Sequence, residues 1–161
     1  MIVVADTSAI SNLLTIGREG LLRQVFGQVI IPSAVEVELR RWHAVLPAFL
    51  ITKRPTASSL LAELGEVLDP GETEAIALGL ELHADLLLID ERKGRAEAAR
   101  LGLKTTGLLG VLLEAKALGL IEKASPVLDD LSRRAGFHVS ASVRREFLYL
   151  AGEAVGSGGE G

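Results

Sequence analysis

The chain has 161 residues and a formal net charge of −4, and 48% of its residues are hydrophobic. This length suits one domain with a substantial core, and the negative charge argues against a protein that coats nucleic acid through a broad basic face. Cysteine is absent, which excludes disulfides and thiolate metal sites. No apolar run is long enough for a membrane span and no export signal stands at the start, so we expect a cytoplasmic protein without a membrane segment.

Short apolar runs alternate with helical patterns along the chain. The predicted strands cover residues 2–5, 28–31, 85–89 and 103–106, and residues 49–52 form either a further strand or an extended crossing segment. The predicted helices cover residues 9–16, 21–26, 34–42, 56–68, 72–83, 96–101, 107–118, 126–135 and 143–150. We expect one domain over residues 1–151 and a disordered, Gly-rich tail over residues 152–161.

This alternation is typical of an α/β fold. Strands that are rich in Val, Ile and Leu, without polar alternation, predict a parallel sheet that is covered on both faces. We therefore expect a three-layer α/β/α sandwich with a central parallel sheet. Right-handed crossovers place the carboxyl ends of the strands along one edge, which is where ligands bind in such sheets.

Two of the apolar strands run directly into an aspartate, Asp6 after the first strand and Asp90 after residues 85–89. A parallel sheet brings both acids to the ligand-binding edge, so both are candidates for chemistry. For the first acid an alternative stays open. Asp6, Thr7 and Ser8 are all favoured N-cap residues, and one of them can simply cap the next helix.

The helix over residues 34–42 carries an acid beside its apolar face. Ser33 and Glu36 have the spacing of a capping box, and an apolar stripe at helical spacing predicts that its last member, Trp42, is buried. Glu38 lies about 60° from the centre of that stripe, at about 100° per residue. A carboxylate in this place needs a partner. It either faces a site, pairs with a neighbouring arginine or reaches solvent.

Glu72 and Glu74 both lie in the first turn of the helix over residues 72–83. The helix dipole favours carboxylates there, which is a structural explanation for both. The two residues are about 200° apart around the helix axis, so we expect at most one of them to face the site.

Asp6 and Asp90 end strands, Glu72 opens a helix and Glu38 borders a buried face, so these four acids can converge at one edge of the sheet. Two carboxylates about 4 Å apart repel each other by about 4 kcal/mol at an effective dielectric of about 20, which favours protonation or a bound cation. Oxygen ligands alone favour Mg²⁺ or Mn²⁺ over Zn²⁺. Such a site suits hydrolysis of a phosphodiester in nucleic acid. An aspartate-based phosphatase would need a second Asp where Ser8 stands, which argues against that class.

Several motifs in order resemble the PIN domain (VapC-like) ribonuclease superfamily, and more closely its DUF3368 branch. The motifs that carry the resemblance are Val4-Ala5-Asp6-Thr7-Ser8, Ile31-Pro32-Ser33-Ala34-Val35, Glu38-Leu39, Pro70-Gly71-Glu72-Thr73-Glu74-Ala75-Ile76, Leu88-Ile89-Asp90-Glu91 and Gly94-Arg95. The resemblance implies a PIN-like sandwich with a shared acidic site, Mg²⁺ or Mn²⁺, and hydrolysis of single-stranded RNA.

Carried onto this chain, the family pattern places the catalytic and metal-binding acids at Asp6, Glu38, Glu72 and Asp90. Glu74 is the alternative to Glu72, although it is displaced by two residues from the family pattern. Glu91 is the alternative to Asp90, because Leu88 stands where the family has a threonine. Thr7, Ser8 and Asn12 correspond to residues that support the first acid.

Arg92, Lys93 and Arg95 give the stretch after the fourth acid an excess of positive charge, and we expect them to hold phosphates of the substrate. The resemblance also implies, for many members, the toxin role of a toxin–antitoxin pair, with a cognate antitoxin as partner. The abundance of apolar residues predicts a homodimer. The competing hypothesis is a catalytically inactive PIN-like module that binds nucleic acid or protein, with its acids serving as caps and ion pairs.

Overall fold

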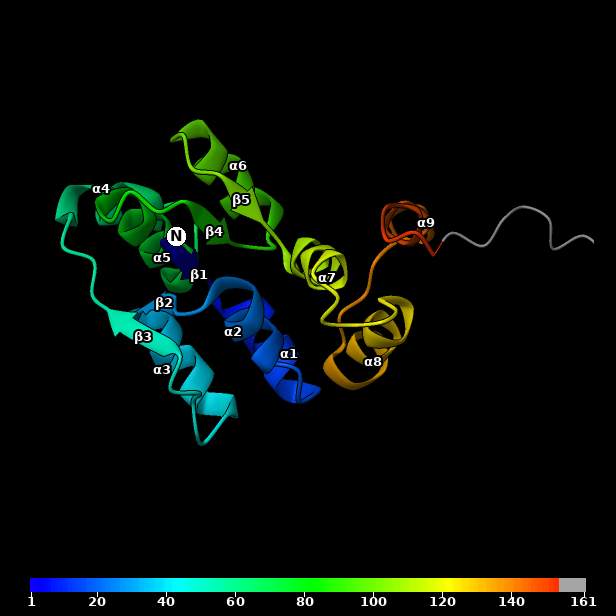
Figure 1. Ribbon diagram of the computed structural model, residues 1–161. Helices are drawn as coiled ribbons and strands as arrows, with labels where there is room; N and C mark the ends of the chain where they lie inside the picture. Colours follow the sequence, from blue (N-terminus) through cyan, green and yellow to red (C-terminus); the bar gives the residue numbers. More distant parts are fainter. Residues whose placement is uncertain (154–161) are drawn as a thin grey trace, which may run out of the picture.

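A computed structural model of the chain describes residues 1–153. Its strands are β1 (Val3–Ala5), β2 (Val29–Pro32), β3 (Leu50–Lys53), β4 (Leu86–Leu88) and β5 (Thr105–Thr106). They form one sheet in the order β3-β2-β1-β4-β5, and all neighbouring strands are parallel. Figure 1 shows β1 and β4 near the middle of this sheet. The parallel sheet that the sequence predicts is confirmed.

Each expected helix is present in the described part of the chain, with some ends displaced. The helices are α1 (Thr7–Thr15), α2 (Gly20–Phe26), α3 (Ser33–Trp42), α4 (Ser58–Gly65), α5 (Pro70–Glu81), α6 (Arg92–Arg100), α7 (Leu108–Ala117), α8 (Ser125–Ala135) and α9 (Ala141–Leu150). α5 begins earlier than predicted because Asp69 caps it, accepting a 2.8 Å hydrogen bond from the Glu72 backbone N–H.

Alternate strand residues enter two separate apolar cores, as the pleat of a strand requires. Val3 and Ala5 of β1 pack into one core with α1, α2 and α7. Val4 points the other way and packs with α4, α5 and α6. Helices therefore cover both faces of the sheet, which confirms the three-layer sandwich. Within residues 1–153, no helix combines the length and the apolar character needed to cross a membrane.

The last two helices extend the layer that contains α1 and α7. α8 packs on α1 and α9 packs on α7, at the right of the view in Figure 1. Glu153 joins this part together, because its carboxylate accepts hydrogen bonds from the backbone N–H groups of Ala124 and Ser125 and from Lys116 Nζ. Of the expected tail, Glu153 thus belongs to the packed structure, and residues 154–161 lie outside the described part.

Two local predictions for α3 are wrong. Trp42 was expected in the core, but it is 76% exposed, because α3 ends at this residue and the apolar layer that receives its earlier turns does not extend so far. The Ser33–Glu36 capping box does not form either. Ser33 donates its hydroxyl to Glu74 at 2.7 Å, while Glu36 pairs with Arg40 at 3.1 Å.

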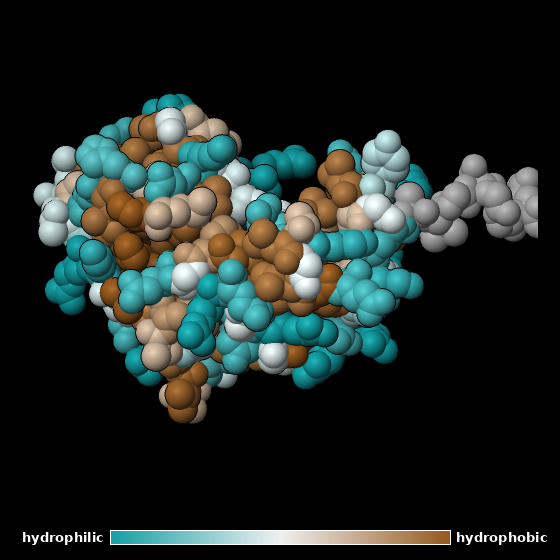
Figure 2. Space-filling model, viewed as in Figure 1, coloured by the Kyte–Doolittle hydropathy of each residue, from teal (hydrophilic) through white to brown (hydrophobic). Residues whose placement is uncertain are grey.

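The loop that follows α3 leaves apolar surface exposed. It forms the lower tip of the molecule in Figure 1, and Figure 2 shows apolar atoms there. Val45 in this loop is 82% exposed. An exposed valine so close to an exposed tryptophan marks the end of α3 as a surface with apolar character.

Candidate functional site

Asp6 and Asp90 lie at the carboxyl ends of adjacent strands. Ala5 pairs with Leu88 in the register of β1 and β4, so Asp6 leaves the sheet beside the residues that lead to Asp90. Asp6 is only 6% exposed and its side chain makes no capping hydrogen bond to α1. The capping alternative for Asp6 therefore does not account for its burial.

Glycine at position 71 allows three carboxylates to approach one point. A side-chain carbon on Gly71 would stand 3.0 Å from Asp6 Oδ1, 3.3 Å from Glu38 Oε2 and 3.6 Å from Asp69 Oδ1. The oxygens come from the end of β1, from α3 and from the residue that caps α5. Three elements that are distant in sequence thus direct acids at the same place, and any side chain at residue 71 would fill it.

These acids line a cavity of about 300 Å³, which we call the acidic cavity. Ten of the described residues line it, and none of them is a lysine or an arginine. They are Asp6, Thr7, Ser8, Ser11, Asn12, Glu38, Trp42, Asp69, Glu72 and Glu91. Half of the lining residues are acids, so the cavity concentrates negative charge without a basic side chain to balance it.

The electrostatic cost of this arrangement is visible in the pKa values of its buried acids. Burial, as the largest cause, and the nearby carboxylates of Asp69, Glu38 and Asp90 together raise the pKa of Asp6 to about 7, although a hydrogen bond from the Thr7 backbone N–H lowers it. Burial is also the main reason why the pKa of Glu72 is raised, followed by its interaction with Asp69. A cation in the cavity would relieve both effects.

Glu38 is held by the residue that follows Asp6. The Thr7 hydroxyl donates a 2.7 Å hydrogen bond to Glu38 Oε2. Thr7 therefore supports the site through Glu38, while its backbone N–H interacts with Asp6. The sequence left open whether Glu38 pairs with a neighbouring arginine. Arg40 does not pair with it, because Arg40 forms an ion pair with Glu36 instead.

The two acids near the start of α5, Glu72 and Glu74, have separate environments, as their angular separation predicts. Glu72 is 6% exposed and lines the acidic cavity. Its Oε2 lies 2.7 Å from the place where a side-chain carbon on Gly94 would stand, so α6 approaches it closely only because residue 94 is glycine. Glu74 accepts hydrogen bonds from the Ser33 hydroxyl and from the Ala34 backbone N–H at 3.0 Å, and so anchors the start of α3.

Asp90 faces a second cavity, which adjoins the acidic one. Its Oδ1 accepts a 3.0 Å hydrogen bond from the Leu108 backbone N–H, and the Ser8 hydroxyl donates to its Oδ2 at a long 3.5 Å. Burial raises its pKa, while Leu108, Arg95 and Ser8 lower it. The two cavities share Ser8, Asn12 and Glu91 as lining residues. Asp90 therefore lies next to the acidic cavity but lines only the second cavity.

Two of the three predicted phosphate-binding residues line the second cavity, and none of them lines the acidic cavity. Arg92 and Arg95, on the first turn of α6, line the second cavity next to Asp90. Lys93 lines neither cavity and is exposed. Of the acids offered as alternatives, Glu91 lines both cavities, whereas Glu74 lines neither. Positive charge thus lies on one side of the acidic cavity.

Asp69 is the acid that sequence reasoning missed. It lines the acidic cavity and is among the carboxylates that raise the pKa of Asp6. The signal was present in Asp69-Pro70-Gly71-Glu72, where an N-cap acid starts the helix that carries Glu72. Because α5 begins beside the acidic cavity, Asp69 can cap this helix and line the cavity at the same time.

The donor set fits a hard divalent cation in its chemistry. Carboxylate oxygens are the ligands that such ions prefer, and the three that surround the Gly71 position come from three different elements. In residues 1–153, however, no three His, Cys, Asp or Glu side chains form a closed group of metal ligands as they stand. The acids therefore suit a divalent cation through their charge, their burial and their clustering around one point.

The sequence as a whole matches a family model, DUF3368, which is described as a PIN domain, over residues 2–153. No curated protein matches the chain. The match spans almost the entire chain and confirms the resemblance that the ordered motifs indicate. The sheet, its helical layers and the acids at its carboxyl edge all lie inside the matched region, and the chain belongs to the PIN domain family.

Proposed function

We propose that this protein is a Mg²⁺- or Mn²⁺-dependent endoribonuclease that hydrolyses phosphodiester bonds of single-stranded RNA. The observation that carries this proposal is the acidic cavity, where carboxylates from β1, α3 and α5 surround one point without a basic residue among the described lining. Membership of the PIN domain family, whose members are typically nucleases, supports it.

Asp6, Glu38 and Glu72 would hold the ion, with Asp90 at the border and Asp69 and Glu91 as further carboxylates. When bound, the divalent ion supplies an activated water and stabilises the charge on the leaving oxygen. The protein's own contribution is to hold these acids around a space that no lysine or arginine of the described residues lines. Thr7 orients Glu38. The absence of a side chain at Gly71 keeps the space between the acids open.

The net charge of −4 requires that RNA be recognised locally. Arg92 and Arg95 meet this requirement, because they line the cavity that adjoins the acids and are placed to attract a phosphate of the strand. Lys93 contributes to the positive potential of the same helix turn from outside the cavity.

A second candidate is a PIN-like module that binds nucleic acid or protein without cleaving it. One observation favours it, namely that the acids among residues 1–153 do not already form a closed ligand group. It predicts that the wild-type protein has no metal-dependent nuclease activity, so the same assay separates the two candidates.

The toxin role, a cognate antitoxin, a cytoplasmic location and a homodimer are finer parts of the proposal. The exposed apolar residues Trp42 and Val45 support a contact with another chain. Light scattering at micromolar concentration tests the homodimer, and a monomer would contradict it. An adjacent reading frame for a small DNA-binding protein would support the toxin–antitoxin assignment.

Cleavage of RNA tests the central activity. The wild-type protein, Asp6→Asn and Glu74→Gln are purified in parallel and incubated with end-labelled single-stranded RNA, with Mn²⁺ or with EDTA. We expect Mn²⁺-dependent cleavage by the wild type and by Glu74→Gln, and a loss of at least about 100-fold in Asp6→Asn. Circular dichroism should show that all three proteins are folded.

Equal cleavage by Asp6→Asn would identify a contaminating nuclease and remove the support for the proposal. Cleavage that continues in EDTA would contradict the metal requirement. No cleavage by the folded wild type with either Mg²⁺ or Mn²⁺ would favour the binding module.

A further inference from the structure

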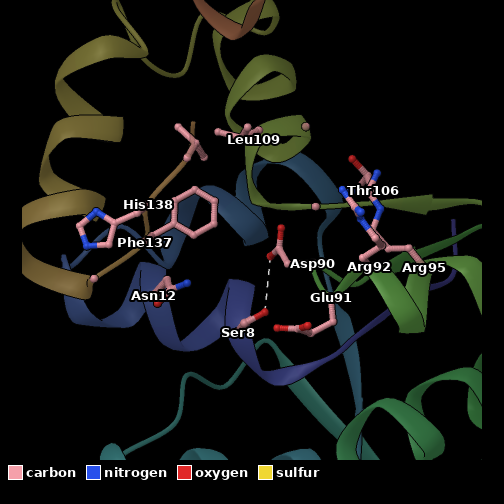
Figure 3. A pocket seen from close by; sticks show the side chains of 14 residues that line it. Ser8, Asn12, Asp90, Glu91, Arg92, Arg95, Thr106, Leu109, Phe137 and His138 are labelled. Atoms are coloured by element: carbon pink, nitrogen blue, oxygen red, sulfur yellow. Dashed lines mark hydrogen bonds between the residues drawn. The ribbon is translucent and has the colours of Figure 1, made fainter. Parts of the chain in front are cut away.

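The second cavity is larger than the acidic one, with a volume of about 690 Å³. Its walls come from α1, from the start of α6, from β5 and α7, and from the segment that follows α8 (Figure 3). A volume of this order is typical of sites for small organic groups. It opens beside Asp90 and shares three lining residues with the acidic cavity, so a chain lying in one can continue into the other.

Phe137 presents an aromatic side chain to this cavity, as Figure 3 shows. Its backbone is fixed on both sides. Gly136 ends α8 in the left-handed conformation at φ 68°, and the Phe137 N–H then donates a 3.0 Å hydrogen bond to the Leu131 carbonyl. The Ser132 hydroxyl donates a 2.9 Å hydrogen bond to the Phe137 carbonyl. The backbone that carries the phenyl ring is therefore fixed before any ligand arrives, and the ring itself packs partly against the core.

The rest of the cavity offers groups of a different kind. Arg92 and Arg95 line it on the side of α6, and Asn12 and Ser8 line it one helical turn apart on α1. Figure 3 shows the arginines and Phe137 on different sides of Asp90. An aromatic surface, an amide with a donor and an acceptor, and two guanidinium groups match the three parts of a nucleotide, which are a flat base, polar base edges and a phosphate.

We propose that this cavity binds one nucleotide of the RNA strand next to the cleavage position, with the base stacked on Phe137 and its phosphate near Arg92 and Arg95. This inference rests on the proposed function for the identity of the ligand, and it adds a substrate-positioning residue, Phe137, that lies far from the acids in sequence. Stacking of a base on Phe137 would require a single strand, because bases in a duplex cannot leave their neighbours to enter the cavity.

A purely structural role for Phe137 is the alternative explanation. Its ring is half-buried and packs against the core beneath α8, as the residue after a helix-ending glycine often does. Leucine keeps this packing but has no flat aromatic face, whereas tyrosine keeps the aromatic face. The pair Phe137→Leu and Phe137→Tyr therefore separates stacking from packing.

The experiment measures the affinity for a fluorescein-labelled, ten-nucleotide single-stranded RNA by anisotropy, in an Asp6→Asn background that prevents cleavage. The kinetic constants of cleavage are measured in the wild-type background. We expect Phe137→Leu to weaken binding and raise KM by about 5- to 100-fold, with kcat changed by less than about 2-fold, as loss of one stacked base requires. Phe137→Tyr should remain close to the parent protein.

Phe49→Leu is the matched control, because Phe49 is also half-buried against the same core but lies before β3, away from the carboxyl edge. It should leave affinity and KM unchanged. Unchanged affinity and KM in Phe137→Leu would overturn the proposal, and so would an equal loss in Phe137→Tyr. Because the anisotropy measurement needs no cleavage, a protein that binds through Phe137 without cutting would contradict the proposed activity and not this inference.

The phosphate contact has its own test. Arg95→Gln should reduce the slope of log Kd against log salt concentration by about 0.7, the value for one phosphate contact on a single strand. A slope identical to that of the parent protein would show that Arg95 does not meet the RNA backbone.

Discussion

The Thr7 hydroxyl and Glu38 Oε2 are joined by a 2.7 Å hydrogen bond across 31 positions of sequence. Thr7 opens α1 directly after Asp6, and Glu38 lies within α3. The bond therefore connects the start of α1, which directly follows Asp6, to α3, which carries Glu38. It fixes the Glu38 carboxylate near Asp6 in spite of their mutual repulsion.

Thr7→Val should loosen this arrangement without unfolding the protein. Valine keeps the shape of threonine and removes the donor, which should lower the free energy of unfolding by about 1 kcal/mol and weaken Mn²⁺ binding severalfold. Thermal unfolding and calorimetric titration measure the two effects. Thr15→Val is the control, since Thr15 donates only to the exposed Ser11 carbonyl. Equal Mn²⁺ affinity in Thr7→Val and wild type would contradict a positioning role.

Stability in the absence of metal should fall as pH rises from 5 to 8. Asp6 has its pKa raised from 3.8 to about 7, so the folded state holds a proton that the unfolded state has already released in this range. The unfavourable charge of folded Asp6 then develops as pH approaches 7 and above. We expect a loss of about 2 kcal/mol, or about 4–8 °C in Tm, measured by calorimetry in EDTA.

The window above pH 5 is chosen because other acids act in the opposite direction below it. Hydrogen bonds lower the pKa of Glu81 and Glu153, whose stabilising contribution is present at higher pH and is lost as pH falls through their pKa. Asp6→Asn should reduce the dependence between pH 5 and 8, and the raised pKa of Glu72 should account for the part that remains. A Tm of wild-type protein that rises over this range would show that the Asp6 carboxyl is not strained by burial.

Glu72→Gln and Glu74→Gln should have opposite effects on the metal-free protein at pH 8. Burial disfavours the charge of Glu72, so glutamine should leave stability equal or increase it. Glu74 accepts two hydrogen bonds at the start of α3, so its loss of charge should cost about 1 kcal/mol. Thermal melts in EDTA decide between them. The reverse order would mean that the assignment of site and structural roles in α5 is inverted.

Asp69→Asn removes the negative charge of this residue but keeps its ability to cap α5. Asparagine is as good an N-cap as aspartate, so α5 should remain capped and Tm should change by no more than about 2 °C. Removing the charge should bring the pKa of Asp6 closer to its usual value, because Asp69 is the first of the carboxylates that raise it. NMR titration of Asp6 measures this pKa, and an unchanged value would exclude the interaction.

Much of the fold could be predicted because local pattern and tertiary structure agree. Uninterrupted apolar runs predict buried parallel strands, and an acid at the end of such a run must lie at the carboxyl edge. Asp6 and Asp90 follow from this rule alone. The angle of about 200° between Glu72 and Glu74 predicts that at most one of them faces the site, but it does not predict which one.

What the sequence left undetermined depends on distances between elements. Periodicity predicts the face of a helix on which Trp42 lies, but it does not say where the core ends, and Trp42 lies beyond that end. The capping box failed because Glu74, a distant residue, binds Ser33 more directly than Glu36 does. The sequence shows that Asp69 precedes a proline at a helix start, but not that the open space at Gly71 lets its carboxylate approach the other acids.

The most direct test of the central claim is a titration of the purified protein with Mn²⁺ at pH 7, followed by calorimetry and by the emission of Trp42. Trp42 is the one tryptophan of the chain and lines the acidic cavity, so a paramagnetic ion bound there should quench it. We expect saturable quenching with the same Kd as the calorimetric titration. Asp6→Asn should bind at least about 10-fold more weakly, while Glu74→Gln should match the wild type. If the wild type binds no Mn²⁺, or if Asp6→Asn binds it equally well, the clustered acids are not a metal site.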